Sequence, residues 1–498
     1  MDSDHDVSGS NEMLSTQDSA SNFAGAFFPR ARNFTVVGGT FTSTTKNYHT
    51  ATLPSDFRTI PLGDINLERE THLVCRRQQP TIRRVYSAKI DGRASSVTVA
   101  MYQGDDARED WRRDIATYMS MRHPNIVQLW GAASSGNIHA AIFNDELIPF
   151  RHFLDLYRHS HFSTVYIYAY TKMDLSVARN YFHSTFQRWL IDKDCTFFVR
   201  RSTGLLCVDL TPSGIELSRP PWWGGRPCQQ GLQSLSALNI EATIIDSLTL
   251  DQYHQICYSE LAQSRLISIS ATAIVDLSAV SFCSPGQQPQ KFAEMVATSR
   301  LEVWENKWAC DGGTLLADGW TRLFASDAVD TTISLICRIL PHSTRIVWFS
   351  QANQIFRRVG ISSNLEDYVL LHAIVFQLIV SATAANPPPN GYLFLCPPKD
   401  FKMGASWSVR WPECPAYWSL DSSGAEQLSA QDAANLGFPA VLMSSTLAGR
   451  SWDASVYAGL RQFHQAKGFD PDSDELVRHL DNGFFSTVQG DRYLSAYR

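Results

Sequence analysis

Four charged residues of this chain are candidates for a site that handles an anionic group such as a phosphate: Arg83, Lys89, Asp114 and Asp209. A guanidinium or an ammonium can neutralise a phosphate, and a carboxylate can accept a proton or hold a divalent cation. Residues 90–171, which follow Lys89, contain no lysine. That absence limits the anion chemistry open to this part of the chain.

Two strands and one helix would have to position these side chains. The β-rich runs 85–93 and 97–104 meet at a turn. The segment 105–121 follows; it begins with two aspartates and contains no Gly or Pro. In that segment Trp111, Ile115 and Met119 recur at four-residue spacing, which predicts an amphipathic helix with these three side chains turned toward a sheet. Asp114 would then lie near the strands.

The segment after this helix carries the most specific motif of the chain. Residues 122–131 read Arg-His-Pro-Asn-Ile-Val-Gln-Leu-Trp-Gly, and residues 80–158 as a whole resemble the small lobe and hinge of protein kinases. The resemblance implies an antiparallel sheet plus one helix, with Asp114 in place of the helix glutamate and either Ala100 or Tyr102 in place of the strand lysine. An unrelated β-hairpin and helix with a turn at Pro124 is the alternative interpretation.

Most other catalytic parts of a kinase are altered or missing. Residues 207–215 resemble the catalytic loop H-R-D-L-K-P-x-N-I, in which Asp209 would be the base, but Thr211 and Gly214 replace the lysine and the magnesium-binding asparagine. The nearest triplet to D-F-G begins at Asp246, so no metal ligand is assigned. Residues 76–84 contain no glycine and cannot cradle phosphates as a glycine-rich loop does.

These losses predict a catalytically inactive, pseudokinase-like protein that acts as a binding or scaffold module with protein partners. No cofactor is expected, and ATP is the one nucleotide that the resemblance would admit. Asp209 and Asp114 are then vestigial. Without the lysine Asp114 is expected to lack a partner, unless it reaches water or borrows a cation such as Arg83 or Lys89, and its replacement by alanine would cost less than about 1 kcal/mol.

Two other functions stay open. In a divergent active kinase Asp209 would be the base, and a relocated cation, Arg83 or Lys89, would replace the lysine. Each of these two side chains is expected on a solvated strand face instead, where Arg and Lys usually lie. An aromatic-faced carbohydrate or protein binder in residues 301–498 is the third candidate, although its tryptophans are expected to fill a core.

Composition narrows the class of protein. The chain has 498 residues, of which 44% are hydrophobic and 18% charged, and its net charge is −6. Its basic residues form no block, which argues against nucleic acid. The ten cysteines are scattered and the first residues are acidic, so we expect a cytoplasmic or nuclear protein without a signal peptide. The apolar run 368–385 predicts a buried strand followed by a second one at 392–396, not a membrane span.

The expected fold class is α+β. Residues 1–55 form a largely disordered segment, 56–158 a kinase-like small lobe and hinge, 159–300 an eroded second lobe and 301–498 an aromatic-rich α+β domain. Short matches at 38–41, 60–65, 392–397 and 418–421 resemble an expanded, mostly uncharacterised family of mushroom-forming fungi, whose members are sometimes labelled as protein-kinase-domain proteins. That resemblance supplies a family and no mechanism.

Overall fold

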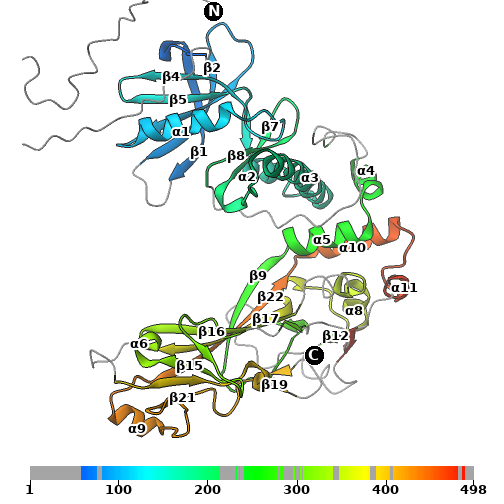
Figure 1. Cartoon of the computed structure of the whole chain (residues 1–498). Coiled ribbons are helices and arrows are strands. Elements are labelled where there is room, and N and C mark those ends of the chain that lie inside the picture. Colours follow the sequence, from blue (N-terminus) through cyan, green and yellow to red (C-terminus); the bar gives the residue numbers. More distant parts are fainter. Residues whose placement is uncertain are drawn as a thin grey trace, which may run out of the picture. The chain divides into compact units, whose positions relative to one another are not determined.

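The computed structural model is a mixed α+β protein built from several antiparallel sheets (Figure 1). It describes residues 58–75, 81–212, 240–277, 280–283, 295–297, 303–304, 307–339, 347–381, 389–403, 408–480 and 485–487, together with Leu232 and Leu235. The expected disorder of residues 1–55 lies outside the described residues. So does the segment 76–80, where a kinase carries its glycine-rich loop.

The first sheet has five antiparallel strands in the order β1-β2-β3-β5-β4. Their bounds are β1 Ile65–Cys75, β2 Ile82–Ile90, β3 Val97–Gln103, β4 Leu129–Ser135 and β5 Ile138–Phe143. Gly92, with φ +74°, allows the turn between β2 and β3. One face of the sheet packs a small aliphatic cluster that includes Ile60, Val97 and Ile142. The other face packs against a helix.

That helix is α1, Ala107–Met119. The predicted amphipathic helix is confirmed, and Trp111 and Ile115 are buried as expected, with the Trp111 indole N–H donating to the carbonyl of Ala140 at 2.8 Å. Met119 is only half-buried, however, and Tyr118 takes the inward place. The buried face also contains Asp114, because positions three and four apart lie on one side of a helix.

A second, three-stranded sheet follows, with β6 Leu147–Pro149, β7 Thr196–Arg200 and β8 Leu206–Asp209 in that order. Between β6 and β7 the chain forms α2, Phe150–Asp155, and the long helix α3, His161–Phe186, which Ser160 caps at its N-terminus. Val127, just before β4, donates its backbone N–H to the carbonyl of Val208 on β8 at 3.0 Å. The end of β8 therefore lies beside the first sheet.

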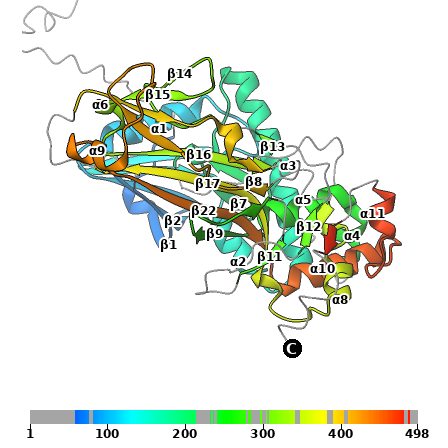
Figure 2. The same ribbon diagram turned by 90° about the horizontal axis from the view of Figure 1, so that it is seen from below.

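The largest sheet has eight strands and is centred on the long strand β17, which pairs with β16, β11 and β22; β22 in turn pairs with β9 (Figure 2). The bounds are β9 Gln263–Ile269, β11 Val280–Phe282, β12 Met295–Ala297, β13 Val303–Trp304, β16 Thr331–Ile339, β17 Tyr368–Val380, β22 Val441–Ser451 and β23 Phe485–Thr487. Three of these strands precede residue 300 and five follow it, so the sheet spans the expected boundary there; the boundary itself stays a prediction.

Two smaller sheets complete the β structure. One contains β14 Thr314–Leu315, β15 Thr321–Phe324, β18 Tyr392–Leu395 and β21 Ala416–Ser419, and the other β10 Val275–Asp276, β20 Ser408–Val409 and β19 Lys402–Met403. The two strands predicted at 368–385 and 392–396 are thus confirmed as β17 and β18. They do not pair with each other but belong to different sheets.

The helices beyond α3 include α4 Ile240–Ser247, α5 Leu250–Glu260, α6 Ala325–Ala328, α8 Ala352–Arg358, α9 Ala430–Asn435, α10 Ala454–Ala466 and α11 Glu475–His479. Thr249 caps the N-terminus of α5, where its side chain accepts the backbone N–H of Gln252. One core joins side chains of α3, α5, α8 and α10 and contains Trp348 and Trp452. Trp308, Trp411 and Trp418 are also buried, which confirms the core interpretation for these tryptophans. In the described part of the chain, no helix is both long and apolar enough to cross a membrane.

Candidate functional site

Arg83 lies on strand β2 with its side chain turned into the protein. It pairs across the sheet with Tyr102 on β3, and both residues are only 1% exposed. The expectation that Arg83 lies on a solvated face is therefore wrong, because the alternation of β2 places it on the side of buried Val85. Lys89 does lie in solvent, with a 60% exposed side chain that pairs with Glu68 at 2.7 Å.

The guanidinium of Arg83 binds Asp209 at the end of β8. Its Nη1 donates to Asp209 Oδ2 at 2.7 Å and to Thr211 Oγ1 at 3.3 Å. The other carboxylate oxygen, Oδ1, accepts from the hydroxyl of Tyr118, which in turn accepts the backbone N–H of Leu210 at 2.9 Å. Both carboxylate oxygens of Asp209 are thus used inside the protein.

Asp114 joins the same network from helix α1. The hydroxyl of Tyr102 donates to Asp114 Oδ2 at 2.8 Å and accepts from Arg83 Nε at 3.2 Å, and that Nε lies 4.0 Å from Asp114 Oδ2. The expectation that Asp114 lacks a partner is wrong, because the hydroxyl of Tyr102 and the guanidinium of Arg83 on the neighbouring strand lie beside its carboxylate. Of the two positions proposed for that lysine, Tyr102 and not Ala100 contacts Asp114.

The electrostatics of the network follow from its burial. Burial lowers the pKa of Arg83, but Asp209 and then Tyr102, Tyr118 and Asp114 outweigh that effect and hold the pKa well above its usual value, so the guanidinium stays charged. Burial raises the pKa of both tyrosines well above 10, which keeps them neutral donors. One cation therefore faces two carboxylates, and the two hydroxyls connect them.

The structure thus gathers three of the four candidate residues, Arg83, Asp114 and Asp209, and leaves Lys89 outside. Tyr102 was named from the sequence only as a possible replacement of the strand lysine, and Tyr118 was not predicted. Tyr118 could have been found from its four-residue spacing to Asp114, which places both on one face of α1. Gly214 lies outside the described residues. Within the described ranges no three His, Cys, Asp or Glu side chains gather in a way that could hold a metal ion.

The chemistry open to this network is limited by its closure. The side chains of Arg83 and Asp209 are each 2% exposed and that of Asp114 10%, so a ligand could reach their polar atoms only if the surrounding strands moved. A phosphate would have to displace the contact between Arg83 and Asp209. In this arrangement the network joins β2, β3, α1 and β8 and does not present charge to a substrate.

The comparisons with known proteins assign no family to the chain. A scan against protein-family models finds no match, and a search of curated proteins finds no significant match.

Proposed function

We propose that this chain is a kinase-like protein that has lost phosphotransfer and serves as a binding or scaffold module for protein partners in the cytoplasm or nucleus. The motif at residues 122–131 and the sheet order β1-β2-β3-β5-β4 with a single helix after β3 support the kinase-like part of the proposal. The hairpin of β7 and β8 after the long helix α3 supports a reduced second lobe. The assignment to the fungal family rests on the short sequence matches alone.

The buried contact between Arg83 and Asp209 carries the proposal of inactivity. Phosphoryl transfer depends on cations and metal ions that face the phosphates and neutralise their charge. Here Tyr102 would replace the strand lysine with a neutral side chain, and Arg83, the cation that the described residues place beside it, is already bound to carboxylates inside the protein. Each tenfold of rate corresponds to about 1.4 kcal/mol of barrier, and several such contributions are absent together.

The position of Asp209 in the fold does not correspond to that of the catalytic base of a kinase. It ends β8, two strands after α3, whereas the H-R-D loop of a kinase directly follows the corresponding long helix. A carboxylate at the end of this hairpin, facing the cation of the small lobe, corresponds better to the magnesium-binding aspartate of D-F-G. Leu210 and Thr211 would then replace its phenylalanine and glycine, and both changes are consistent with a lost metal site.

A divergent active kinase is the second candidate, and one observation favours it. Arg83 contacts Asp114 on α1 and Asp209 on β8. In a kinase the carboxylate at the first position would pair with the lysine, and the one at the second would bind the metal. Opening the contact between Arg83 and Asp209 would free a cation beside two carboxylates. The two candidates therefore differ in whether ATP and magnesium can open it.

An ATP titration of the purified full chain, with and without magnesium, separates them. Isothermal calorimetry should show no binding to the native protein, and labelled ATP with generic protein substrates should leave no incorporation. The matched variants are Arg83→Gln, which removes the buried cation, and Arg84→Gln, which removes its half-exposed neighbour that pairs with Glu70. Incorporation that Arg83→Gln abolishes and Arg84→Gln preserves would establish the active kinase.

A further inference from the structure

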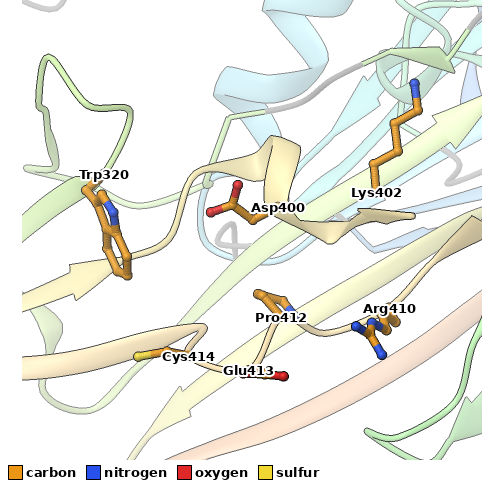
Figure 3. Close-up of a pocket in the computed structure, with 7 residues that line it drawn as sticks. All are labelled: Trp320, Asp400, Lys402, Arg410, Pro412, Glu413 and Cys414. Atoms are coloured by element: carbon orange, nitrogen blue, oxygen red, sulfur yellow. The ribbon is translucent and has the colours of Figure 1, made fainter. Parts of the chain in front are cut away.

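A charged hollow lies beside the proline-rich segment that joins β20 to β21, remote in the sequence from the network of Arg83 (Figure 3). Its volume is about 530 Å³, within the range of small-molecule sites. The residues that line it include Trp320, Asp400, Lys402, Arg410, Pro412 and Glu413.

The walls of this hollow are anchored to the core. The backbone N–H of Arg410 donates to the carbonyl of buried Phe401 at 3.0 Å, which holds the two segments of the wall together. Trp411 is buried and its indole N–H donates to Ser445 Oγ at 2.7 Å. These contacts restrain the backbone that leads into Pro412. The half-buried ring of Trp320 packs edge-on against Tyr417 at 5.1 Å.

The chemistry of the lining excludes several kinds of ligand. Asp400 and Glu413 contribute two negative charges and Lys402 and Arg410 two positive ones, so the site has no net charge. The lining therefore has no excess of positive charge that would favour a phosphate or a nucleotide. A lipid would take four charged groups out of water, which costs more than burying the apolar surface of Trp320, Pro412 and Cys414 would gain.

We propose that this hollow binds a neutral polyhydroxylated ligand, namely a carbohydrate. Sugar hydroxyls both donate and accept hydrogen bonds, which suits a lining that contains carboxylate acceptors together with a guanidinium donor. The C–H face of a sugar ring carries slight positive charge and stacks on the negative face of an indole such as Trp320. In Figure 3 the rings of Trp320 and Pro412 and the carboxylate of Asp400 border the hollow together.

The test is calorimetry and ligand-observed NMR on the full chain with cellotetraose, chitotetraose, xylotetraose and maltotetraose. At least one of these should bind, and Trp320→Ala should weaken that binding at least tenfold. Trp189→Ala is the matched control, because that tryptophan is 61% exposed and lies outside the hollow, and it should leave the affinity unchanged. Asp400→Asn changes an exposed residue without changing its size, and it should also weaken binding. This second variant keeps the proposal testable if Trp320→Ala misfolds.

Three results would overturn the proposal: no binding of any of the four sugars, sugar binding that Trp320→Ala leaves intact, or binding only of a charged probe such as inorganic phosphate or a trilysine peptide. None of these readouts involves ATP. Failure of the sugar site and failure of the kinase-like proposal can therefore be told apart.

Discussion

Replacing Asp209 by alanine should loosen the contact between the first sheet and the end of β8 more than almost any other single change. The variant removes the carboxylate that accepts Arg83 Nη1 at 2.7 Å and the hydroxyl of Tyr118. The guanidinium stays charged and buried without its main partner. Breaking a buried ion pair in this way costs about 3–5 kcal/mol, which is a large share of the stability of an ordinary domain.

A double variant separates the cost of leaving Arg83 buried without its carboxylate from the net contribution of the ion pair to stability. In Arg83→Met with Asp209→Leu both charges disappear and side chains of similar size fill the space. Replacing a whole buried pair by apolar residues is often nearly neutral, so the double variant should be more stable than the single Asp209→Ala. Some cost remains, roughly 1–2 kcal/mol, because the hydroxyl of Tyr118 loses its acceptor.

Hydrogen exchange of backbone amides is the appropriate assay, because a chain of this length does not unfold in one two-state step. A loss of 3–5 kcal/mol lowers the protection of amides in β2 and β8 by roughly 10²- to 10³-fold or more. Glu70→Ala, which removes a partly exposed ion pair with Arg84, is the control and should change protection less than about fivefold. A loss below tenfold in Asp209→Ala, or a double variant as weak as the single one, would refute the reasoning.

Three further predictions follow from other buried contacts. Asp114→Ala should cost about 1–3 kcal/mol in denaturant unfolding, because it leaves a buried tyrosine hydroxyl without its acceptor; Asp114→Asn keeps an acceptor and should cost less, and equal losses would contradict the geometry. His464 lies 2.9 Å from His254, nitrogen to nitrogen, and burial lowers its pKa to about 4. The unfolded chain therefore binds this proton first, so stability should fall as the pH drops from about 6.5 to about 4, and thermal melts of His464→Gln should show a shallower fall; an unchanged pH profile would remove this histidine as the cause. Gly459→Ala should cost about 1–3 kcal/mol, because the new Cβ would lie 2.2 Å from a histidine ring atom, whereas Gly63→Ala meets nothing within 4 Å and should be neutral in thermal melts; equal effects would contradict the packing of α10.

The sequence by itself determined much of the local structure. The four-residue spacing of Trp111 and Ile115 predicted α1, and the apolar runs predicted β2, β3, β17 and β18. These signals are reliable because a helix or strand must place its apolar residues at a fixed period. The pairing of β17 was not predictable in the same way. One partner, β16, is the preceding strand, but β22 comes from a distant segment, and several apolar strands could have paired with β17 equally well.

Only the tertiary structure decided what the charged residues do. Arg83 and Asp209 are 126 residues apart, and no local pattern shows that one strand brings a carboxylate to the other. A residue type predicts a solvated face on average, but a buried cation is stable wherever folding supplies acceptors, as Asp209 and the hydroxyl of Tyr102 do here. The sequence therefore named three of the residues that meet at this site, and the tertiary contacts decided that they bind one another, because the energy of a buried charge depends on which groups surround it in space.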